Sequence, residues 1–380
     1  MNALILTNRF KEFSGSEIIA LEVADFLKDC GFEVSIYTNM LGKPICNEIK
    51  KEQINMSDSD NVPNLLHFDI IWAQHHLLPM TISNIAKKPG RYDFPFIITA
   101  HLSPYEPFES AGFYCERKFS NIIAVNSKET ETEMQSNGLE KHKLITFYNG
   151  APQKFFLDSE EAPALKKILL ISNHPPKEIL HALKILNKKI TVQIKIIGKG
   201  LDMYKRLTPK DFMWADAVIT IGKLVQYAIA SKKAIFCYDH FGGPGWITRK
   251  NYKRAEWYNY SGRCCGTKLT PEEIAFELET NFLFAQKEIR HIHNETKERY
   301  NFNSFLNKII SKHTQTTRNS FQLNDSDIAL IRTETNFAKN LRRLYRENLQ
   351  HKHSTISVKL LINKAWRKIQ NICSEVKFFI

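Results

Sequence analysis

The N-terminal stretch MNALILTNRFKEFSGSEIIALEVADFLKDCGFEVSIYT (1–38) decides which fold this sequence can adopt. Its apolar run from Ala3 to Thr7 is short and bounded by polar residues, as in a buried parallel strand. From Gly15 onward, apolar residues at helical spacing lead to Gly31, which predicts an amphipathic helix with a glycine stop. The segment from Phe32 to Thr38 predicts a second strand. A strand, a helix and a strand in this order predict a parallel βαβ unit.

The same alternation continues in two series, which predicts two α/β domains. Apolar runs typical of buried strands lie at 68–74, 96–101 and 121–127 in the first series, and at 167–173, 192–198, 216–222 and 234–239 in the second. The polar stretch 152–163 between them predicts a linker. A helical pattern from 271 to 313 closes the second series. We therefore expect domains at 1–151 and 164–313, each with a parallel sheet between helices.

Composition excludes several classes of protein. A chain of 380 residues that is 43% hydrophobic and 24% charged can bury two sizeable cores and is not a disordered or fibrous sequence. No run approaches the roughly 20 apolar residues that span a bilayer, and no basic region precedes the first apolar run. The seven cysteines include no CxxC pair and no cluster at zinc spacing. We expect a protein of a reducing compartment, without a secretion signal.

Positive charge is concentrated at the C-terminus. Residues 316–380 contain 12 Lys and Arg against 5 Asp and Glu, within a net charge of +13 for the chain. From 357 to 380 apolar residues recur at helical spacing between lysines, which predicts a basic amphipathic helix. Such a helix can pack on the protein body or a partner subunit, lie on an anionic membrane surface, or contact nucleic acid. The basic residues lie outside the two domains and form no recognised nucleic-acid motif, so nucleic acid is the least favoured partner.

Several strand ends carry glycines and lysines suited to a bound phosphate. In an open parallel sheet, ligands bind beyond the carboxyl ends of the strands, where helix N-termini offer free N–H groups. The strongest such end is DHFGGPGW (239–246), which predicts either a nucleotide-phosphate or sugar-binding loop or an irregular connection. Lys199 and Lys223 follow two other strand ends and can each supply a positive charge to a diphosphate or remain solvated. Gly15 fits either a phosphate contact or simple turn geometry.

Histidines at strand ends are the candidates for proton transfer, since a general base at neutral pH is most often His. His101 has the most suitable setting because it ends a buried apolar run and precedes a loop; a structural histidine is the alternative reading. The acidic pairs Asp58/Asp60 and Asp325/Asp327 lie in polar stretches, so we expect no metal there. The further candidates for proton transfer are His75, His76, His174, Glu17 and Glu106.

The order of these elements resembles that of the GT-B glycosyltransferases, in particular the bacterial enzymes of families 4 and 1 that build surface polysaccharides from nucleotide sugars. SGSE (14–17), a helix and GFEVSIYT (31–38) are similar to that family's Gly-Gly-x-Glu loop, helix and Gly-His-x-Val strand. The resemblance covers about residues 3–313. Three further segments that resemble family elements are NIIAVNSKET (121–130), TFYNGAPQKFF (146–156) and RYNFNSFLNKII (299–310).

The resemblance implies two Rossmann-like domains facing a cleft, and a hexosyltransferase type of activity in lipopolysaccharide or other cell-surface polysaccharide biosynthesis. It places a nucleotide-diphosphate sugar in the C-terminal domain and a saccharide or lipid-linked glycan acceptor in the N-terminal domain. No metal or other cofactor is expected, because helix N-termini, backbone N–H groups and lysines stabilise the leaving diphosphate. The residues expected at the donor are Gly15, His174, Lys199, Gly222, Lys223, Gln226, Gly242 and Gly243, and those expected at the reacting centre are His101 and Glu17.

The sequence departs from this family at a pair of glutamates that are spaced eight residues apart in the donor-binding domain. Val218 stands at the first position and Gln226 at the second. Glutamine can hydrogen-bond a ribose hydroxyl but carries no charge. Retention and inversion of the anomeric configuration therefore both stay open.

Two other functions fit the same pair of α/β halves. A nucleotide-sugar epimerase of this fold is expected to show acidic catalytic pairs, and the sequence contains no convincing one. A non-catalytic GT-B-like binding protein would have lost its glutamates together with its chemistry. We expect a cytoplasmic protein in peripheral contact with the inner face of a membrane through residues 316–380, because lysines and arginines near an anionic leaflet attract it.

Overall fold

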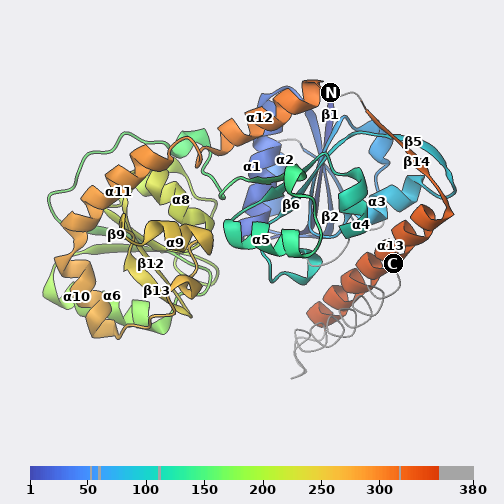
Figure 1. Ribbon diagram of the computed structural model, residues 1–380. Helices are drawn as coiled ribbons and strands as arrows, with labels where there is room; N and C mark the ends of the chain where they lie inside the picture. The colour runs from blue at the N-terminus through green and yellow to red at the C-terminus, as the bar shows by residue number, and fades with distance from the viewer. Residues whose placement is uncertain (52–53, 59–60, 110–112, 316–317, 351–380) are drawn as a thin grey trace.

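The computed structural model describes residues 1–51, 54–58, 61–109, 113–315 and 318–350 (Figure 1). These residues form two α/β domains, each built around a largely parallel sheet, which confirms the predicted fold class. The amphipathic helix predicted at 357–380 lies outside the described residues. None of the helices described is long and apolar enough to cross a membrane.

The N-terminal domain contains a seven-stranded parallel sheet in the order β3-β2-β1-β4-β6-β7-β8. The apolar strand β1 lies inside it, with Leu4 opposite Ser35 of β2 and Ile71 of β4. Parallel strands need helices on both faces, which explains why β1 is apolar on both sides. The strands are β1 (Asn2–Phe10), β2 (Glu33–Leu41), β3 (Asn55–Asp58), β4 (Ile70–Gln74), β6 (Phe96–His101), β7 (Ile122–Val125) and β8 (Leu144–Thr146).

Helices from both ends of the chain cover this sheet. One face is packed by α1 (Gly15–Asp29), α2 (Ile45–Lys51) and α12 (Phe302–Gln315). The other face is packed by α3 (Leu78–Ile85), α4 (Phe113–Phe119) and α13 (Asp325–Gln350). The helix α5 (Lys128–Ser136) follows β7.

Two predicted boundaries therefore differ from the structure. We assigned the helical pattern up to residue 313 to the second domain, but α12 crosses back and buries Phe302 and Phe305 beside Phe147 in the N-terminal core. We treated residues 316–380 as a tail, but their described part, 318–350, adds β14 (Asn319–Leu323) and α13 to the same domain. In both cases the apolar face of a helix, α12 or α13, is buried against a segment that is distant in the sequence.

The C-terminal domain contains a five-stranded sheet in the order β10-β9-β11-β12-β13. Its last strand is antiparallel to β12 and consists of the glycine-rich sequence that we predicted to be a loop. The strands are β9 (Lys167–Ile171), β10 (Gln193–Ile197), β11 (Ala217–Thr220), β12 (Ala234–Asp239) and β13 (Gly242–Trp246); the helices are α6 (Lys177–Lys189), α7 (Pro209–Trp214), α8 (Lys223–Ala230), α9 (Tyr252–Trp257), α10 (Pro271–Thr280) and α11 (Phe282–Thr296).

The chain crosses between the domains twice, and the two crossings run side by side. The backbone N–H of Ala151 donates to the Tyr300 carbonyl over 2.7 Å, and the Phe302 N–H donates to the Ala151 carbonyl over 3.0 Å. A Cβ atom on Gly150 would lie 2.6 Å from the Tyr300 oxygen, so only glycine permits this close approach. The paired crossings connect the domains beside the cleft.

Candidate functional site

A pocket lies between the two domains, and domain interfaces are a common place for small-molecule sites. The N-terminal domain contributes the β1–α1 loop and the start of α1. The C-terminal domain contributes the ends of β9 and β10, the segment 204–207 and the start of α8. We call it the interdomain pocket; its lining includes Phe13, Ser14, Gly15, Glu22, Lys154, Asn173, Gly198, Tyr204, Lys205, Arg206 and Lys223.

Glu17 holds the β1–α1 loop in shape. Its carboxylate is buried and accepts hydrogen bonds from the backbone N–H groups of Lys11 and Glu12, at 2.8 and 3.1 Å, and from the hydroxyl of Ser14 at 2.5 Å. The carboxylate is thus occupied by its own loop. We predicted Glu17 at the reacting centre, whereas the structure places it behind Gly15, where it fixes the entrance to α1.

The same loop makes direct contact with the second domain. The N–H of Phe13 donates to the Tyr204 hydroxyl over 2.8 Å, and the two rings meet edge to face. Lys199 pairs with Glu12 at 2.7 Å and is half exposed. Lys199 therefore bridges the domains at the rim of the cleft. His174, predicted on the donor side, is exposed and does not line the interdomain pocket.

Lys223, predicted beside phosphate, forms a buried ion pair across the domains. Its ammonium lies 2.9 Å from the Glu22 carboxylate of α1 and donates to the Gly150 carbonyl over 3.0 Å. Both side chains are almost inaccessible to water. Burial lowers the pKa of Lys223 and raises the pKa of Glu22, and each group opposes the shift of the other. The pair joins α1 to the start of α8 across the two domains, and removal of either partner would leave the other buried without its counter-charge.

Gln226 also binds the segment at Tyr148 and Asn149, where the chain first crosses between the domains. Its side-chain amide donates to the Tyr148 carbonyl over 2.7 Å. Tyr148 and Asn149 have φ values of 52° and 51°, the left-handed region that non-glycine residues seldom occupy. The Asn149 amide in turn donates to Asn259 of the C-terminal domain over 2.8 Å. The position predicted to face a ribose thus holds a strained crossing segment here.

The glycine-rich sequence packs as a strand. Gly242 has a φ of 100°, and a Cβ atom there would lie 2.1 Å from the Thr267 carbonyl oxygen. A Cβ atom on Gly243 would lie 2.2 Å from the Cys237 carbonyl oxygen. Close backbone packing therefore explains both glycines, and neither lines the interdomain pocket. Gly222, with a φ of 60°, is the residue that precedes α8 at this pocket.

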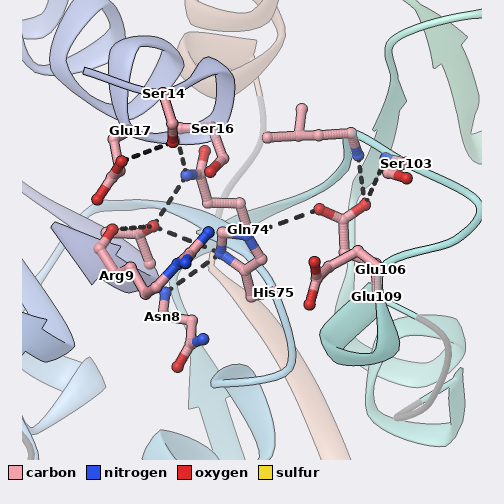
Figure 2. A network of polar contacts seen from close by, with 12 residues as sticks. Asn8, Arg9, Ser14, Ser16, Glu17, Gln74, His75, Ser103, Glu106 and Glu109 are labelled. Atoms are coloured by element: carbon pink, nitrogen blue, oxygen red, sulfur yellow. Dashed lines mark hydrogen bonds and ion pairs between the residues drawn. The ribbon is translucent and has the colours of Figure 1, made fainter. Parts of the chain in front are cut away.

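A second pocket lies in the N-terminal domain, on the other side of the start of α1. It shares Ser14 and Gly15 with the interdomain pocket. We call it the N-domain pocket, and Figure 2 shows its polar network. The remaining lining residues are Asn8, Arg9, Ser16, His75, Leu102, Ser103, Glu106 and Glu109.

Glu109 is the buried carboxyl group of the N-domain pocket. One carboxylate oxygen accepts the backbone N–H groups of Leu102 and Ser103, at 2.5 and 2.8 Å (Figure 2). The other lies 3.7 Å from Nε2 of His75. Burial raises the pKa of Glu109 to about 8, although the charge of His101 and the two backbone hydrogen bonds lower it. A carboxyl group with this pKa can gain or lose a proton near neutral pH.

His75 is a neutral neighbour of Glu109. Burial, followed by the charges of Arg9 and His101, lowers the pKa of His75 to about 3. The Asn8 N–H donates to its Nδ1 over 3.2 Å, so the ring proton is on Nε2 and faces Glu109. The φ of His75 is 64°, which marks local strain at the end of β4. The imidazole of His75 therefore gives Glu109 a fixed polar contact but no positive charge.

His101 lies deeper, outside the lining of either pocket. Its Nε2 is 2.7 Å from the Glu116 carboxylate, and both residues are buried. Burial alone lowers the pKa of His101, but the charge and hydrogen bond of Glu116 outweigh it and raise the pKa overall. We predicted His101 beside the reacting centre. The structure instead places it one layer behind, next to Glu109.

Sequence reasoning missed Glu109 because it considered the histidine at the end of the strand and not every acidic residue of the loop that follows. Glu106 and Glu109 both lie in that loop, and only the fold shows which of them is buried. It also missed Tyr204 and Arg206, which lie in a segment without glycine or a motif. Within the described part of the chain, no group of three or more His, Cys, Asp or Glu side chains is placed to hold a metal ion.

Comparisons with known proteins agree with this architecture. Residues 13–154 match the model of Glycosyltransferase Family 4. No protein of curated function matches the sequence. The HepE protein of Anabaena, solved with UDP and glucose, is 13% identical with a TM-score of 0.54, over 83% of this chain and 100% of its own. A glycosyltransferase of Rickettsia africae ESF-5 is 13% identical with a TM-score of 0.53, and the match covers 83% of this chain and 98% of that protein. Residues 13–154 therefore match glycosyltransferase family 4, and the chain as a whole has the GT-B fold.

Proposed function

We propose that this protein transfers a sugar from a nucleotide-diphosphate sugar to a hydroxyl group of a saccharide or glycolipid. The observation that carries the proposal is the pair of pockets that meet at Ser14 and Gly15, one between the domains and one in the N-terminal domain. A transferase needs two substrates to meet at one point. The start of α1 is such a point, and its N–H groups favour a negatively charged diphosphate there.

The donor occupies the interdomain pocket in this proposal. Lys154, Lys205 and Arg206 line it and can donate hydrogen bonds to the oxygens of a diphosphate. Arg206 is anchored by Asp25 and Lys205 by Asp211, so both cations are held in position. The structures of HepE with UDP and with UDP-glucose support a uridine nucleotide as the first donor to test.

The acceptor occupies the N-domain pocket, where Glu109 is the general base. Its ionised form takes the proton of the acceptor hydroxyl as that oxygen bonds to the anomeric carbon. The bond from the anomeric carbon to the diphosphate breaks, and the diphosphate leaves with the electron pair. Arg9 and the serines of the lining supply hydrogen-bonding groups suited to a saccharide. The anomeric configuration of the product, measured by NMR, distinguishes inversion from retention.

The pathway and the location belong to the same proposal. We infer a role in bacterial cell-surface polysaccharide synthesis, such as that of lipopolysaccharide, at the cytoplasmic face of the membrane. In this proposal the membrane contact is made by the basic segment 351–380, which contains six of the lysines and arginines of the C-terminus. Anionic lipids attract such a basic segment.

A thermal-shift screen against UDP, GDP, ADP and their sugars, without added metal, tests the donor pocket. A ligand that binds only the folded state raises the melting temperature. The matched variants are Gly15→Asp and Gly15→Ala, because a Cβ atom at Gly15 meets nothing within 4 Å. We expect one nucleotide series to stabilise the wild type and Gly15→Ala, and the added carboxylate of Gly15→Asp to abolish the shift.

No shift with any nucleotide, or an equal shift in Gly15→Asp, would contradict the proposal. Binding without release of UDP in the presence of saccharide acceptors would instead indicate a non-catalytic binding protein.

A further inference from the structure

The C-terminal segment 318–350 returns to the side of the N-terminal domain that carries the N-domain pocket. Strand β14 pairs antiparallel with β5 (Gly90–Phe94), and α13 packs along α3 and α4 (Figure 1). Ile328, Ile331 and Ala338 of α13 are buried in the core on that face. The segment is therefore an integral part of the domain.

Glu334 of α13 contacts both α4 and the segment that bears His75. The carboxylate of Glu334 accepts the N–H groups of Tyr114 and Cys115 at the start of α4, at 2.8 and 3.0 Å. The backbone carbonyl of Glu334 lies 3.3 Å from Nε2 of His76, next to His75 in sequence. Thus α13 supports one wall of the N-domain pocket through the backbone that carries His75.

Tyr345, near the end of α13, supports the opposite wall. Its hydroxyl donates to the Glu106 carboxylate over 3.0 Å, and its ring lies 4.7 Å, edge to face, from that of Phe108. Phe108 is completely buried. The Glu106 carbonyl accepts the N–H of Glu109 over 2.8 Å, which begins the 3₁₀ turn Pro107–Glu109. Tyr345 thus holds both residues that precede and shape the position of Glu109.

We propose that Tyr345 is a positioning residue for acceptor recognition: from α13 it fixes the loop 102–109 so that Glu109 faces His75. The assignment to the acceptor rests on the proposed function, whereas the control of the loop does not. Tyr345 touches neither pocket directly. A residue more than 230 positions away in sequence therefore sets the geometry of the carboxyl group that serves the acceptor.

Hydrogen–deuterium exchange of the full-length protein tests this without any ligand. Tyr345→Phe removes only the hydroxyl and keeps the ring on Phe108. The matched control is Tyr114→Phe, which removes a tyrosine hydroxyl that also donates to a carboxylate between α13 and α4, that of Asp327. We expect the amides of Leu102, Ser103 and Glu109 to exchange about tenfold faster in Tyr345→Phe and at the wild-type rate in Tyr114→Phe.

Unchanged exchange at these three amides in Tyr345→Phe, or an equal increase in Tyr114→Phe, would overturn the inference. A kinetic assay adds a readout that general destabilisation does not produce. With UDP-glucose as probe donor and octyl β-glucoside as probe acceptor, Tyr345→Phe should raise the acceptor KM several-fold and leave the donor KM unchanged. A wild type that transfers no sugar from any nucleotide sugar contradicts the proposed function, while the exchange result still decides the role of Tyr345 in the loop.

Discussion

Replacement of Glu109 by Gln is the sharpest test of the N-domain pocket. Glutamine has the shape of a protonated glutamate, so its carbonyl oxygen can still accept the N–H groups of Leu102 and Ser103. What it loses is the ability to ionise. The structure raises the pKa of Glu109 from 4.5 to about 8, with burial as the main cause. The variant should therefore change how stability depends on pH.

The sign and size of this change follow from proton linkage. Between pH 4.5 and 8 the folded protein holds a proton on Glu109 that the unfolded chain has released, so the free energy of unfolding falls as pH rises. Each pH unit in this window corresponds to about 1.4 kcal/mol. From pH 5.0 to 7.5 the wild type should lose roughly 3 kcal/mol relative to Glu109→Gln, which has no such group.

Urea unfolding of both proteins at pH 5.0 and 7.5 measures the effect, since other titrating groups cancel in the difference. Glu133→Gln, on the exposed side of α5, is the control and should follow the wild type. A difference between wild type and Glu109→Gln that stays constant within about 0.5 kcal/mol would refute the reasoning. In transfer assays Glu109→Gln should lose about 10² to 10⁴ in kcat, and the wild-type kcat/KM should rise with pH toward about 8.

Three further predictions test the Lys223–Glu22 ion pair, the glycine-rich strand β13 and the C-terminus. Lys223→Met should reduce the free energy of unfolding by about 3 to 5 kcal/mol, because it leaves the Glu22 carboxylate buried without its counter-charge. Lys199→Met, at an exposed pair, should reduce it by less than about 1 kcal/mol. Similar losses for the two variants in urea unfolding would contradict the buried ion pair. Gly242→Ala should destabilise by roughly 3 kcal/mol through its φ of 100° and its clash, and Gly15→Ala by less than about 1 kcal/mol; equal melting temperatures would refute this account. Removal of 351–380 should release the protein from phosphatidylglycerol liposomes in flotation assays, and unchanged flotation would exclude this segment as the membrane contact.

The sequence was sufficient for the fold class and for the elements at the start of the chain. Strand β1, α1 and β2 follow from local patterning, because a strand buried on both faces must be apolar and a helix at the surface must be amphipathic. The position of Gly15 at the start of α1 also follows, since ligands bind where parallel strands end. The same local reasoning gave the wrong structure for Gly242 and Gly243, because a glycine needed for close packing and a glycine needed for a ligand look alike in a sequence.

Local patterning therefore predicts the elements and their order, because these depend on residues a few positions apart. Which charged groups are buried, and what they face, depends on how distant segments pack together. Lys223 meets Glu22 across two domains, and Tyr345 meets Glu106 across most of the chain. The pKa of Glu109 depends on such long-range burial, and a pattern of neighbouring residues carries no information about it.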